Sequence, residues 1–184
     1  MSAPIVSIFT PRREPCRARS GLVEGLHLES RLSWPARVTA PANLSERLTD
    51  SYGLARKHHR VHVADLELSF SRYQAEDRFR LDEICAFTNP QLWKREALPA
   101  PPGGAAPGYL LFDVPYDEDE VVYTAGDRAG LVFDEQNARL RSRFVEGVVE
   151  GRWIGLADTL FAVVDGRELL ALQFEGFTID DNPA

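Results

Sequence analysis

Cysteine is scarce in this sequence of 184 residues, which holds only Cys16 and Cys85. Two cysteines close at most one bridge, so the chain is not a small disulfide-stapled domain, and we expect two free thiols in a reducing compartment. No segment approaches the roughly 18 apolar residues that a membrane-spanning helix needs. The apolar run at residues 4–9 is too short for a secretory leader and follows no basic residues, so we expect a cytoplasmic protein that does not associate with a membrane.

The motifs of several common enzyme classes are also missing. The sequence contains no Walker A loop, no GxGxxG, no CxxC, no HExxH and no GxSxG. Its paired glycines, Gly103 and Gly104, lie among prolines, where a strand-to-helix phosphate cradle cannot form. We therefore predict no cofactor and no resident metal, and an enzyme is not the favoured interpretation.

Charge is distributed unevenly along the chain. Residues 1–97 hold 15 Lys and Arg against 12 Asp and Glu, a net charge of +3, whereas residues 109–184 hold 6 against 16, a net charge of −10. The stretch between them, residues 98–108, is rich in Pro and Gly. Because Pro lacks a backbone N–H donor and Gly adds backbone freedom, the stretch is expected to form neither a helix nor the hydrogen-bonded ladder of a β-sheet, and to be an exposed loop. Frequent Arg, Ala, Gly and Pro favour a GC-rich bacterial genome.

Alternating polar and apolar residues predict β-strands on both sides of this loop. Residues 26–34 alternate with a period of two, and residues 138–144 do so in the acidic half. The strongest local signal is a hairpin, because Asp165-Gly166, a favoured type I′ turn, separates two β-rich runs at residues 160–164 and 169–174.

Two segments predict short helices. Asn43 and Glu46 resemble a capping box in front of apolar residues at helical spacing. Asn89 would cap a second helix, with Pro90 at its first position. The predicted fold is therefore α+β and mostly β, an antiparallel sheet of about six to nine strands with two or three short helices.

The expected domain organisation has two parts. Residues 1–20 are predicted to form a flexible Arg-rich N-terminal arm, and residues 21–184 a single α+β domain with the Pro/Gly-rich loop at residues 98–108. The arm could touch phosphates, but the far half of the same chain offers a net charge of −10, so self-association or a mobile tail is favoured and no nucleic acid is expected.

The most distinctive candidate site is an acidic run with neighbouring aromatic residues. Carboxylates at residues 117–120 follow a predicted turn at Pro115-Tyr116, and aromatic anchors inside a charged rim are typical of specific interfaces. We therefore interpret the chain as a small protein-binding module, an inhibitor or immunity-type partner of a protein with a basic surface. The predicted partner-binding residues are Tyr116, Asp117, Glu118, Asp119, Glu120, Tyr123 and Trp153.

Two alternatives stay open at this point. His58 and His62 share a face in a helix or a strand, and with Asp65 or Glu67 they could form an enzyme site of unknown class around residues 58–67. A structural or assembly subunit, forming homo-oligomers, is the other alternative. The alternating guanidinium groups of Arg139, Arg141 and Arg143 are expected to be the wet face of a strand, with recognition of phosphate or carboxylate as the minority interpretation.

Overall fold

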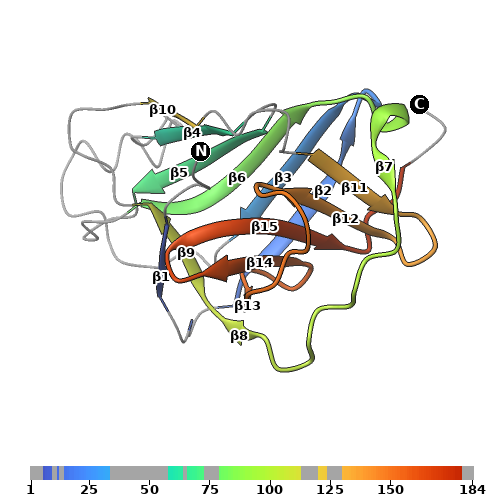
Figure 1. The fold of residues 1–184 in the computed structure, drawn as a ribbon. Helices are drawn as coiled ribbons and strands as arrows, with labels where there is room; N and C mark the ends of the chain where they lie inside the picture. The colour runs from blue at the N-terminus through green and yellow to red at the C-terminus, as the bar shows by residue number, and fades with distance from the viewer. Residues whose placement is uncertain are drawn as a thin grey trace.

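The computed structural model describes residues 6–9, 12, 15–33, 58–63, 66–72, 79–112, 120–123 and 130–179. These residues form 15 β-strands arranged in two sheets (Figure 1). The sheets share one hydrophobic core, to which the inner faces of both contribute. The alternation of side chains along each strand explains this arrangement, since every second residue turns inward and the residues between them face outward.

The first sheet has eight strands in the order β1-β9-β6-β5-β4-β10, with β3 also paired to β6 and β2 paired to β3. All its pairs are antiparallel except β10 with β4. The strands are β1 (Ser7–Phe9), β2 (Arg17–Val23), β3 (His27–Ser33), β4 (His58–Val63), β5 (Leu66–Arg72), β6 (Phe79–Phe87), β9 (Tyr109–Phe112) and β10 (Glu120–Tyr123).

The second sheet has seven strands in the order β7-β11-β12-β15-β14-β13-β8. Its five central strands pair antiparallel, and the two-residue strands β7 and β8 pair in parallel with β11 and β13 at opposite edges. The strands are β7 (Lys94–Arg95), β8 (Ala106–Pro107), β11 (Gly130–Asp134), β12 (Arg139–Arg143), β13 (Arg152–Gly155), β14 (Leu160–Asp165) and β15 (Glu168–Glu175).

The hairpin predicted around Asp165-Gly166 is present. Strands β14 and β15 are antiparallel neighbours, and Asp165 pairs with Glu168. The two central residues of the turn are therefore Gly166 and Arg167, one position later than expected. Gly166 has a φ of 55°, whereas Arg167 is not among the residues with positive φ. A positive φ at the first central residue alone is the pattern of a type II′ turn, not of the predicted type I′ turn.

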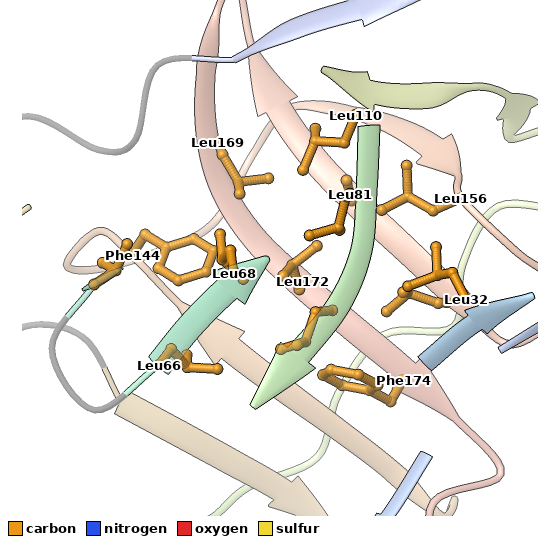
Figure 2. Close-up of a cluster of buried hydrophobic side chains, with 14 of the residues drawn as sticks. Leu32, Leu66, Leu68, Leu81, Leu110, Phe144, Leu156, Leu169, Leu172 and Phe174 are labelled. Atoms are coloured by element: carbon orange, nitrogen blue, oxygen red, sulfur yellow. The ribbon is translucent and has the colours of Figure 1, made fainter. Parts of the chain in front are cut away.

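Leucine and phenylalanine side chains are prominent in the core between the sheets (Figure 2), which also contains valine, isoleucine and alanine. Leu68 and Leu81 come from the eight-stranded sheet, and Leu172 and Phe174 come from the seven-stranded one. All four are at most 1% exposed. Because residues from both halves of the sequence bury each other, neither sheet has a complete core by itself.

The predicted α+β fold is wrong, because the described part of the chain is nearly all β, has two sheets and contains no α-helix. The helix expected at Asn89 is one 3₁₀ turn, Pro90–Leu92. Asn89 does cap this turn, accepting a hydrogen bond of 3.0 Å from the Gln91 amide. The turn ends because Trp93 is extended and buried, 6.0 Å from the Phe133 ring. The helix expected from Asn43 lies outside the described residues.

The Pro/Gly-rich stretch, residues 98–108, is a strap that joins the two edges of the seven-stranded sheet. The expectation that it forms no strand pairing is wrong at its end, where Ala106 and Pro107 form β8 and pair with β13. The strap leaves β7 at one edge and reaches β8 at the other, as the yellow-green chain in Figure 1 shows. Leu98 is 4% exposed, and its amide donates to the Asp134 carboxylate at 2.8 Å. Hydrogen bonds from the Leu98 and Asn137 amides hold the pKa of Asp134 below its usual value. The stretch is therefore attached to the sheet at its first residue.

Parts of the expected N-terminal arm are also strands. Residues 7–9 form β1, which pairs with β9, and Arg17 begins β2. The Val6 amide donates to the Arg167 carbonyl at 2.7 Å, and the Ala18 amide donates to the Asp158 carboxylate at 2.9 Å. These contacts join the beginning of the described chain to the seven-stranded sheet.

Candidate functional site

Two of the residues predicted to bind a partner belong to a strand at an edge of the eight-stranded sheet. Tyr116, Asp117, Glu118 and Asp119 lie outside the described residues, whereas Glu120 and Tyr123 are the first and last residues of β10. Strand β10 is the last in the strand order, and it pairs in parallel with β4. Among the strands that the structure describes, none pairs with the other side of β10.

Trp153, the remaining predicted partner-binding residue, lies in the other sheet. It belongs to β13 and is half-buried. The Arg141 guanidinium lies 5.3 Å from the centroid of its ring, and the Phe161 ring meets it edge-on at 6.4 Å. A guanidinium over an indole is a favourable cation–π arrangement. The structure therefore associates Trp153 with Arg141 and not with the residues of β10.

The His/carboxylate site of the alternative interpretation lies on the outer face of the eight-stranded sheet. Residues 58 and 62 both belong to β4, where their even spacing places them on one face. His62 pairs across the strands with Glu67, and its Nε2 lies 3.8 Å from a Glu67 carboxylate oxygen. Glu67 in turn pairs across the strands with Cys85 of β6, so His62, Glu67 and Cys85 form one row across three neighbouring strands. Asp65 lies outside the described residues.

This row contains an imidazole, a carboxylate and a thiol, but the thiol is not activated. Burial raises the pKa of Cys85 to about 11, and the carboxylates of Glu83, Glu67 and Glu29 add to the effect. A nucleophilic cysteine requires the opposite, a cation that lowers the thiol pKa. Cys85 therefore lacks the lowered pKa that a nucleophilic cysteine needs.

We expect both cysteines to resist thiol reagents in the native protein. Cys16 and Cys85 are free, and burial raises their pKa values to about 12 and about 11 from 9.0. A rise from 9.0 to about 11 lowers the thiolate fraction of Cys85 at pH 8 about a hundredfold. Labelling with a chromogenic disulfide at pH 8 should be slow in buffer and should reach two thiols rapidly in guanidinium chloride. Rapid labelling of Cys85 in buffer would contradict this prediction.

A network of buried polar side chains lies on the outer face of the seven-stranded sheet, beneath the strap. Gln173 of β15 is fully buried, and its carbonyl oxygen accepts hydrogen bonds from Nε and Nη2 of Arg141. Its amide nitrogen donates to the Pro99 carbonyl at 3.0 Å and to Glu175 at 2.7 Å. Arg139 donates from Nη1 to the Leu98 carbonyl at 2.9 Å and from Nε to Glu175 at 3.1 Å. The strap is thus held by its backbone carbonyls.

The role of this network was not predicted from the sequence. The alternation of Arg139, Arg141 and Arg143 was expected to mark a solvent-exposed strand face, whereas Arg141 is only 4% exposed. Gln173 is a polar residue within the otherwise apolar run at residues 169–174. A polar side chain at a buried strand position needs a hydrogen-bonding partner, and that requirement was the available signal.

The comparisons with known proteins find no match for this chain. No protein-family model matches it, and a search of curated proteins finds none with significant similarity. Within the ranges that the structure describes, no group of three or more His, Cys, Asp or Glu residues could hold a metal ion. In the same ranges, no helix is long and apolar enough to span a membrane.

Proposed function

We propose that the chain is a small protein-binding module that docks a basic surface of another protein, as an inhibitor or immunity-type partner does. The observation that supports the proposal is the position of β10. This strand is last in the order of its sheet, and the carboxylates at residues 117–119 immediately precede Glu120, its first residue. The acidic run therefore adjoins the edge strand of the eight-stranded sheet.

Such an edge selects its partner by charge. Unpaired amides and carbonyls of an edge strand can pair with a strand of another chain. Carboxylates beside the edge disfavour pairing with a second copy of the same acidic segment, and they favour a segment rich in Lys or Arg. The net charge of −10 over residues 109–184 would also accelerate the encounter with a basic protein. In this proposal the protein acts in the bacterial cytoplasm, where Cys16 and Cys85 stay reduced.

The first test removes the charge next to the edge. In a variant with Asp117→Asn, Glu118→Gln, Asp119→Asn and Glu120→Gln, we expect association with the basic partner to slow about tenfold or more at low salt, because complementary charge acts mainly on the association rate. The partner is captured from host lysate with the tagged full chain at low salt, identified, and purified. Association rates are then measured on a sensor surface over a range of salt concentrations.

A matched variant controls for net charge alone. Glu24, Glu135, Glu150 and Glu168 are exposed and lie away from β10 in the sequence and in the sheets. Replacing all four with glutamine removes the same charge, and the association rate should fall less than in the first variant. Equal rates for the two variants would refute docking at the acidic run. Failure to retain any basic partner at low salt would refute the proposed function.

A further inference from the structure

A cavity of about 470 Å³ opens between the strap and the outer face of the seven-stranded sheet. The beginning of the strap forms one wall, and the loop between β12 and β13 forms the other. Two side chains of β12 reach it from the sheet. The residues that matter for its chemistry are Lys94, Glu96, Leu98, Arg141, Arg143 and Val148.

Arg141 is a buried cation without a carboxylate partner. Its side chain donates from Nε and Nη2 to one neutral acceptor, the carbonyl oxygen of Gln173. Among the described residues, no Asp or Glu lies within ion-pair distance of it, and Nη1 has no hydrogen bond. A buried charge is stable only with compensation, and most buried charges in proteins have a direct opposite charge. Burial first, and then the Arg143 charge, lower the pKa of Arg141 to about 10, although the more distant charges of Glu175 and Glu96 oppose this shift.

The other charges around the cavity leave it positive. Nη2 of Arg143 donates to Glu96 at 3.1 Å, and the same carboxylate also pairs with Lys94. Nε of Arg143 has no hydrogen-bond partner among the described residues, but it is buried, so a ligand in the cavity would have to use the other donors of this guanidinium group. Lys94 and Arg143 therefore share one carboxylate, Arg141 has none within ion-pair distance, and Nη1 of each guanidinium group makes no hydrogen bond among the described residues.

The arrangement is rigid and has apolar walls. Arg141 is fixed between the amide of Gln173 and the ring of Trp153, so its guanidinium plane is already oriented. Leu98 and Val148 contribute apolar surface, and the Val148 side chain is exposed at the entrance. Oriented guanidinium donors suit the two oxygens of a carboxylate, while apolar walls suit a hydrocarbon body.

We propose that this cavity binds an organic carboxylate with a short apolar body, held by the free N–H donors of Arg141 and Arg143. The ligand is either a free acid or the C-terminal residue of a peptide. This site lies on a different sheet from the acidic edge, so it does not depend on the function proposed above.

The test compares an acid with its neutral analogue on the full ¹⁵N-labelled chain. We expect 4-methylpentanoate to shift the arginine Nε–H signals of Arg141 and Arg143 and the indole signal of Trp153, whereas 4-methylpentanamide should not. The peptide Gly-Gly-Leu and its C-terminal amide distinguish the two sources. A peptide that binds more tightly than the free acid assigns the site to a chain terminus, and the reverse order assigns it to a small acid.

Three variants locate the binding. Arg143→Gln and Lys94→Gln should each weaken the binding of the preferred acid, the former about tenfold, because a hydrogen bond to a charged group is lost. Lys94 is mostly exposed, so its replacement should not unfold the protein. It therefore tests the contribution of positive charge to ligand binding even if Arg143→Gln lowers stability. Arg152→Gln, exposed on β13 and outside the cavity lining, should leave affinity unchanged. An amide that binds as tightly as the acid, no binding of either acid, or full affinity in both cavity variants would overturn the proposal.

Discussion

Replacing Gln173 with leucine is expected to lower the free energy of unfolding by about 3 kcal/mol, since removing one partner of a buried charged group leaves the other uncompensated. Gln173 is fully buried, and its carbonyl oxygen is the acceptor for both Nε and Nη2 of Arg141. Leucine has a similar volume but cannot accept those hydrogen bonds. The loss also removes the donor to the Pro99 carbonyl and so weakens the attachment of the strap. Urea denaturation followed by circular dichroism measures the change.

A second variant separates the cost of the uncompensated charge from the cost of the lost amide. With Arg141→Met added to Gln173→Leu, no buried charge remains, so the double variant should be more stable than Gln173→Leu alone. The carbonyl of Pro99 and the carboxylate of Glu175 still lack the amide donor, so recovery should be incomplete. A double variant no more stable than Gln173→Leu would mean that the charge is not what makes Gln173 necessary.

Local patterns predicted the strands whose two faces differ in polarity. The alternation around Arg139, Arg141 and Arg143 marks β12, and the runs beside Asp165-Gly166 mark the hairpin of β14 and β15. These signals can be recognised within a single strand, because the two faces of the strand differ in polarity and the residues alternate between them. The partition of the strands between two sheets is not local. Strand β6 pairs with the preceding strand β5, but also with β3 and β9, which are distant in the sequence, and nothing in the periodicity of β6 identifies these two partners.

Contacts between distant segments also explain the incorrect or incomplete predictions. Asn89 and Pro90 provide a good helix start, but burial of Trp93 against Phe133 ends the turn after one 3₁₀ segment. The composition of residues 98–108 predicts a loop, yet it does not show that Asp134, Arg139 and Gln173 hold the beginning of that loop against the sheet. Tertiary contacts override local propensity in the first case and add to it in the second.

Phe174→Ala is expected to lower the free energy of unfolding by about 4 kcal/mol, the typical cost of deleting a buried aromatic ring together with the cavity that it leaves. Phe174 is fully buried in the shared core, where it lies 6.4 Å from the Phe177 ring (Figure 2). Phe161 provides the matched control, since it lies in the neighbouring strand β14 but is only half-buried, beside Trp153. Phe161→Ala should cost less than half as much.

Denaturant titration of both variants tests the register between β14 and β15 directly. Phe174 faces the core, while Phe161 pairs with Gln173 on the opposite face. Because a slip of one residue would exchange the two faces, an equal or larger cost at Phe161 would contradict the assignment of the shared core to the face that carries Leu172 and Phe174 in β15.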